Sequence, residues 1–230
     1  VLSSGCADST PSASPPMGFT EHLIEGNFNY PFGVQAGDLD NDGDLDLTMP
    51  DIFGDNLELK ARSALYWFEN DGLGAFTRHM VNTEAGFWER HVITDIDGDG
   101  LEDIVIPNNR DGGVLWYKNP GTFDPWIRNV VITNLAGNAD YTRRLYGIDA
   151  ADFDGDGDND LVVSAYNDTF IALLENPGSA NLHLEWAQFN IGDKLGTIRT
   201  VDVGDINGDG FLDILVASEG VDTTVTPLTN

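Results

Sequence analysis

Four short acidic segments of the chain have the composition and spacing of loops that bind a divalent cation. Each follows the pattern D-x-[DN]-x-D-G-x-x-D, and they begin at residues 38, 95, 152 and 205, which are 57, 57 and 53 residues apart. Acids at positions 1, 3 and 5 of a tight loop can point inward, and the glycine at position 6 allows a sharp turn. Because Ca²⁺ takes roughly six to eight oxygen ligands in flexible geometry, about four calcium sites are predicted.

The predicted calcium ligands occupy positions 1, 3, 5 and 9 of each loop. They are Asp38, Asp40, Asp42 and Asp46; Asp95, Asp97, Asp99 and Asp103; Asp152, Asp154, Asp156 and Asp160; and Asp205, Asn207, Asp209 and Asp213. Magnesium is an alternative, although it takes fewer protein ligands in octahedral geometry. An EF-hand would place Glu at position 12 between two helices, whereas position 12 here is Met49, Ile106, Val163 or Val216, so that motif is excluded.

The segments around the loops also repeat, and they predict the elements that position the acids. A β-prone run precedes each loop, at 32–37, 89–94, 146–151 and 198–204. An apolar run follows each loop, at 45–50, 103–108, 160–165 and 213–218. A third run ends in Asn, at 65–70, 114–119, 171–176 and 225–230, and a fourth closes three units, at 76–81, 126–132 and 186–191. All are too short for helices and predict strands. Four strands per unit at this period are typical of a propeller blade.

The predicted layout is a Ser/Pro-rich leader at 1–18 followed by an all-β propeller domain at 19–230. Its antiparallel blades are expected at about 25–81, 82–132, 133–192 and 193–230. The segment FTEHLI at 19–24 resembles the closing strand FTRHMV of the first unit, whereas the fourth unit has no such strand. We therefore expect residues 19–24 to complete a fourth blade, either of the same molecule or of a neighbour.

The loops and their flanking strands resemble the FG-GAP/VCBS repeats of calcium-bearing β-propellers, found in integrin heads, fungal lectins and bacterial surface proteins. The resemblance covers roughly residues 19–230, judged by the blade template. It implies that an ion clips the loop between the first two strands of each blade, with all loops on one face. Family propellers usually carry about seven blades, so four repeats favour a fragment of a larger propeller or an unusual assembly.

The overall charge excludes two classes of partner. Lys and Arg number 11 against 39 Asp and Glu, a net charge of −28, and both nucleic acids and anionic membranes attract cationic surfaces. No apolar run approaches the roughly 20 residues of a membrane helix. The one cysteine, Cys6, excludes an internal disulfide. The small residues before it resemble the end of a lipoprotein signal, but a lone thiol in the leader is the preferred interpretation.

These observations predict a non-catalytic, extracellular or cell-surface module with a structural or adhesive role, self-associating through its N-terminal strand or binding glycans or surface proteins. One alternative is a lectin-like propeller, in which tryptophans stack on sugars; Trp88, which departs from the repeat, is the best candidate. Another is the propeller portion of a polysaccharide lyase or sugar dehydratase, but four histidines and 11 basic residues supply such a site poorly. Asn167 is the candidate for N-glycosylation.

Overall fold

A computed structural model describes residues 20–28, 30–51, 63–83, 90–108, 112–122, 124–135, 145–165, 170–192 and 196–219. This part of the chain contains fourteen strands and no helix, which confirms the all-β expectation. It accordingly has no helix that is long and apolar enough to cross a membrane.

The strands form four antiparallel sheets, each built from one repeat. The first sheet contains β1 (Gln35–Gly37), β2 (Asp46–Asp51), β3 (Ala64–Asn70) and β4 (Phe76–Thr83). The second contains β5 (Val92–Thr94), β6 (Asp103–Asn108), β7 (Gly113–Lys118) and β8 (Ile127–Ile132). The third contains β9 (Leu145–Ala151), β10 (Asp160–Ala165), β11 (Phe170–Glu175) and β12 (Ala187–Gly192). The fourth pairs β13 (Thr197–Gly204) with β14 (Asp213–Glu219). Strand order within every sheet follows chain order, which confirms the predicted blade pattern.

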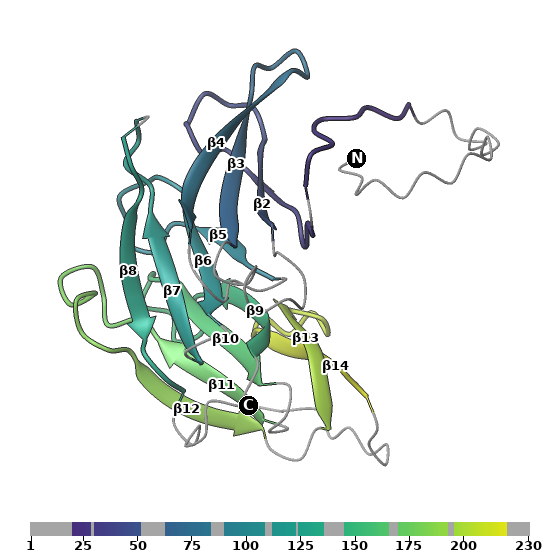
Figure 1. Cartoon of the computed structure of the whole chain (residues 1–230). Coiled ribbons are helices and arrows are strands. Elements are labelled where there is room, and N and C mark those ends of the chain that lie inside the picture. The colour runs from purple at the N-terminus through teal and green to yellow at the C-terminus, as the bar shows by residue number, and fades with distance from the viewer. Residues whose placement is uncertain are drawn as a thin grey trace.

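The sheets follow one another along a curve, as the blades of a propeller do (Figure 1). Their first strands lie on the inner side, where β1 contacts β5, β5 contacts β9, and β9 contacts β13. Each acidic loop joins the first strand of a sheet to the second. The repeat therefore places all four loops at the same end of their sheets.

Apolar side chains from facing sheets form the core. One cluster joins the first and second sheets, a second joins the second and third, and a third joins the third and fourth. Side chains alternate as the strand period requires: on β3, Leu65 and Trp67 face the second sheet, whereas Tyr66 and Phe68 point to the opposite side. Trp67, Trp116, Trp126 and Trp186 are all buried in these clusters, so they pack between blades.

The N-terminal segment covers the face of the first sheet that points away from the second. Ile24 and Phe28 pack there against Phe68 and its neighbours. Arg78 on β4 holds the segment, because its guanidinium lies 3.5 Å from the Glu25 carboxylate and 5.7 Å from the centre of the Phe28 ring. In a propeller this face receives the preceding blade, so the segment occupies part of that blade's place.

Residues 20–24 nevertheless form no strand, which differs from the expectation for the segment 19–24. A strand requires a hydrogen-bonded neighbour, and the third strand expected in the fourth blade, at 225–230, lies outside the described residues. No apolar cluster of the described residues joins the fourth sheet to the first. The leader at 1–18 with Cys6, and the residues Trp88 and Asn167, also lie outside the described part.

A buried histidine links the first two sheets. His91, immediately before β5, is 1% exposed, and its Nε2 lies 2.6 Å from the Thr48 hydroxyl on β2. Its Nδ1 has no hydrogen-bond partner among the described residues. Burial lowers the pKa of His91 from 6.5 to about 4, so the imidazole is neutral in the folded protein at neutral pH.

This burial predicts a loss of stability in mild acid. The unfolded chain takes up a proton near pH 6.5 while the folded chain resists it until about pH 4, so stability falls as the pH drops through that window. We expect His91 alone to lower the free energy of unfolding by about 2 kcal/mol between pH 7 and pH 5. Urea titrations in EDTA at both pH values test this, with His91→Gln as the non-titrating comparison. An equal pH dependence in the two proteins would contradict the prediction.

Candidate metal centre

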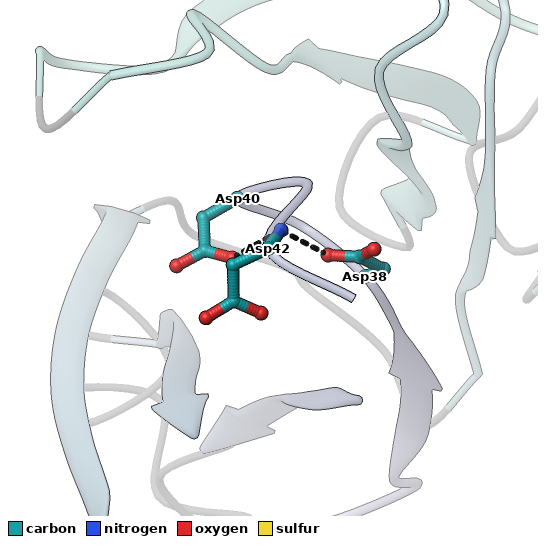
Figure 2. A group of neighbouring side chains, drawn as sticks. All are labelled: Asp38, Asp40 and Asp42. Carbon is teal, nitrogen blue, oxygen red and sulfur yellow. Dashed lines mark hydrogen bonds between the residues drawn. The ribbon is translucent and has the colours of Figure 1, made fainter. Parts of the chain in front are cut away.

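The acids at positions 1, 3 and 5 converge in three of the loops. In each group one carboxylate oxygen from every residue lies within 4.8 Å of those of the other two. The groups are Asp38, Asp40 and Asp42; Asp95, Asp97 and Asp99; and Asp152, Asp154 and Asp156. Figure 2 shows the first group, in which the backbone N–H of Asp42 donates to the carboxylates of Asp38 and Asp40. The predicted spacing therefore produces three clusters of oxygen ligands.

Hydrogen bonds to the backbone hold the first aspartate of each loop in place. The two oxygens of Asp152 accept the N–H groups of Asp156 at 3.1 Å and Gly157 at 3.1 Å, and the same pair of bonds recurs in the other three loops. Position 6 has a positive φ in every loop, at Gly43 (96°), Gly100 (88°), Gly157 (96°) and Gly210 (90°). Glycine adopts this conformation without strain, which explains its place in the motif.

The fourth loop has the same backbone geometry but less charge. Asp205 accepts the N–H groups of Asp209 and Gly210 at 3.0 and 2.9 Å, and Asn207 accepts that of Asp209 at 2.8 Å. Because Asn207 replaces an acid at position 3, this loop has only two carboxylates at positions 1, 3 and 5. An amide oxygen can also bind Ca²⁺, so the loop retains an oxygen ligand set of lower charge.

The ninth-position aspartates have a visible structural task. Asp46, Asp103 and Asp160 are at most 2% exposed. In each, one carboxylate oxygen accepts the backbone N–H of the residue at loop position 2. The other oxygen accepts the backbone N–H of the asparagine at the end of the third strand, which is Asn70, Asn119 or Asn176. For Asp160 these donors are Phe153 at 3.1 Å and Asn176 at 2.8 Å. Their predicted role as calcium ligands stays a prediction.

Burial of these aspartates is electrostatically costly without a cation. It raises the pKa of Asp46 and Asp160 above the usual range and raises the pKa of Asp103 to about 7. The backbone hydrogen bonds act in the opposite direction, because they stabilise the ionised carboxylate. Acids at other loop positions add repulsion to each of the three. A bound divalent cation would relieve both effects.

The asparagines that follow β7 and β11, Asn119 and Asn176, connect successive blades. The Asn176 side-chain amide donates to the carbonyl of Asn159 in its own loop and to that of Ile96 in the preceding loop, both at 3.1 Å. Asn119 repeats this pattern with the carbonyls of Glu102 and Leu39, at 3.0 and 2.6 Å. The first and second loops are therefore fastened to the next blade as well as to their own.

The first two loops differ in their electrostatics. In the first loop, burial raises the pKa of Asp40, and the neighbouring acids Asp42 and Glu69 raise it further. In the second loop, the Lys118 ammonium pairs with Asp97 and lies 2.6 Å from Asp99. Burial there would raise the pKa of Asp99, but hydrogen bonds from Lys118 and the backbone lower it below its usual range.

The donor sets suit a hard cation. All ligand atoms are oxygens, and at positions 1, 3 and 5 they sit on a loop whose shape the backbone hydrogen bonds and a glycine fix in advance. Carboxylates and carbonyls are the ligands that Ca²⁺ prefers, and Mg²⁺ accepts them in a stricter geometry. The first and third loops fit such an ion directly, since no cationic side chain of the described residues pairs with their acids.

A sequence model of the FG-GAP-like repeat matches the chain twice, at residues 95–163 and 152–216. Together the matches span 95–216, more than half of the 230 residues. The chain belongs to the FG-GAP-like repeat family. Each match begins at the first aspartate of one loop and ends in the second strand of the next blade. None of the curated protein sequences compared with the chain matches it.

Two features of the site were not predicted from the sequence. The sequence does not predict that Asn119 and Asn176 bridge successive blades, although the third-strand runs end in Asn. The contact of Lys118 with the second loop was also missed. Aligning these runs shows only that the charge at this position differs, because the residue before the Asn is Glu69, Lys118 or Glu175.

The two kinds of loop aspartate should respond differently to neutralisation in metal-free buffer. The two buried oxygens of Asp160 accept two backbone N–H groups. Asn has only one side-chain oxygen, so we expect Asp160→Asn to lower the free energy of unfolding by about 2 kcal/mol. Asp154 is exposed and repelled by neighbouring acids, so Asp154→Asn should change it by less than about 0.5 kcal/mol. Urea unfolding in EDTA makes the comparison. Equal losses would show that position 9 has no special structural task.

Proposed function

We propose that the protein is a non-catalytic, calcium-stabilised β-propeller module with a structural or adhesive role outside the cell or on its surface. The observation that carries the proposal is the repetition of one acidic loop at the same end of successive blades. An ion in each loop would tie together the strands that build the blade.

Calcium is the ion we favour. The loops use carboxylates from three or four positions of one short segment, and such sites in extracellular modules have affinities near the millimolar calcium level outside cells. The net charge of −28 also suits a protein that works with bound cations. These two features support an extracellular or cell-surface location and about four sites.

Self-association is the proposed basis of the structural role. The first sheet offers a face that the N-terminal segment only partly fills, and the fourth sheet exposes Leu215, which is 58% exposed, on the side away from the third sheet. Leu23, within the segment predicted to complete a blade, is 66% exposed. Insertion of residues 19–24 into the fourth blade of a second copy would bury these side chains. Because the two surfaces differ, repeated insertion would build a filament.

The histidines give little support to an enzymatic role. His91 is buried between sheets, and His79 stacks on Trp67 and lies 2.8 Å from Glu69. His91 therefore packs between two blades, and His79 pairs within one. Glycans or surface proteins remain proposed partners for the adhesive role, and the charge disfavours nucleic acids and membrane insertion.

Carbohydrate binding is a second candidate, supported by one cavity. A cavity of about 220 Å³ lies beside the first loop and is lined by Asp40, Asn119, Thr122 and two tryptophans, Trp67 and Trp126. Sugars bind well where aromatic faces and polar groups meet. However, Trp67 and Trp126 are only 5% and 8% exposed, which leaves little ring surface for a sugar, so we favour the structural role.

Calcium should stabilise the fold. Each site filled at about ten times its dissociation constant adds about 1.4 kcal/mol, so with about four sites we expect the melting temperature to rise by at least about 5 °C between EDTA and about 10 mM calcium. Differential scanning calorimetry measures the shift, and magnesium at the same concentration should give a smaller one. A melting temperature that is independent of calcium would overturn the calcium proposal.

Leu23→Asp should weaken self-association without unfolding the monomer. The side chain is exposed in the single chain, so an acid there costs little stability, but it could not enter a neighbour's apolar blade. Light scattering coupled to size exclusion, in calcium and over a range of concentrations, reports the mass. Leu73→Asp is the matched control, since Leu73 is 92% exposed in the turn between β3 and β4. A wild-type chain that stays monomeric throughout would refute the assembly.

A further inference from the structure

One position differs among the three complete blades in the sign of its charge. Glu69, Lys118 and Glu175 each precede the bridging asparagine on the third strand of their sheet. They occupy the same register, paired with Thr77, Ile127 and Ala187 on the fourth strands. The strand therefore directs the same backbone position toward the loop in all three blades, and only the second blade places a cation there.

The Lys118 ammonium lies among the acids of its loop. It pairs with Asp97 Oδ2 and lies 2.6 Å from Asp99 Oδ2, so it bridges positions 3 and 5 of the cluster. The Lys118 side chain is 28% exposed, and that of Asp97 is 14% exposed, which places this ion pair partly out of water. In the first loop, by contrast, Glu69 adds negative charge close to Asp40.

The Asp97 carboxylate retains acceptor capacity. Its Oδ1 is buried and has no hydrogen-bond partner among the described residues, while only Oδ2 contacts Lys118. A single ammonium thus supplies one positive charge and satisfies part of a cluster of three carboxylates. A divalent ion would have to displace it to coordinate positions 3 and 5, and this displacement lowers the affinity of the loop.

We propose that Lys118 is a built-in counter-ion that holds the second loop in shape without metal and makes it a weaker calcium site than the first and third loops. The lowered calcium affinity rests on the proposed calcium binding. The role of Lys118 in holding the loop in shape concerns the metal-free protein and does not depend on calcium binding. The loops at 38–46 and 152–160 would then fill with calcium first, and the loop at 95–103 would fill only at higher concentration.

Replacement of Lys118 tests the lowered calcium affinity. In Lys118→Glu the second blade acquires the residue of its neighbours, so isothermal titration with calcium should show one site that binds at least about tenfold more tightly than in the wild type. Glu175→Lys is the matched control in the third blade, and it should weaken one site by a similar factor. Titrations of Lys118→Glu and wild type that superimpose would overturn the lowered affinity.

The stabilising role of Lys118 in the metal-free protein is tested separately, by the melting temperature. In EDTA, Lys118→Met leaves three converging acids without their cation, so its melting temperature should fall by at least about 3 °C. In saturating calcium the difference from wild type should shrink, because the ion replaces the ammonium. If wild type binds no calcium, the proposed function fails while the EDTA comparison still decides the role of Lys118. An unchanged melting temperature of Lys118→Met in EDTA would refute that role.

Discussion

The buried aspartate at position 9 of the first three loops is the constraint on which their blades depend. Its two oxygens accept one N–H from the loop and one from the third strand, and it sits at the base of the second strand. Three parts of the blade are thereby fixed to a single carboxylate. An apolar residue could not replace it, because two buried N–H groups would then lack acceptors. The acidic motif is thus partly a folding motif, whatever ion it binds.

The asparagine bridge extends this constraint from one blade to the next. Asn119 and Asn176 each bind the carbonyl at position 8 of their own loop and that at position 2 of the preceding loop. The repeated unit is therefore the segment from one loop to the following blade, which is also the segment that the family matches span. Stability of such an array comes mainly from contacts between neighbours, and the apolar clusters between sheets follow the same rule.

Much of this organisation could be predicted from the sequence, because local rules determine it. The strands predicted at 103–108 and 160–165 are confirmed as β6 and β10 with the same bounds. Each apolar run lies between an acidic turn and a polar segment, and this contrast in the sequence marks its two ends. The convergence of positions 1, 3 and 5 followed from the glycine turn. The contacts of Lys118 and the bridges of Asn119 and Asn176 could not be predicted from local rules, because they join residues 16 to 80 positions apart. Whether residues 20–24 form a strand also depends on a partner strand, which the local sequence does not specify.

The same bridge indicates what the first blade lacks. Asn70 is equivalent to Asn119 and Asn176, and its amide donates to Leu45 at position 8 of its own loop at 3.1 Å. Among the described residues it has no counterpart of the second bond that Asn119 and Asn176 make to the preceding loop. Ile206, at position 2 of the fourth loop, provides the equivalent carbonyl at the other end of the array. The Asn70 amide and the Ile206 carbonyl are thus complementary groups at the two ends of the described array. Because no apolar cluster of the described residues joins the fourth sheet to the first, we propose that a further blade or a second copy of the chain joins these two ends.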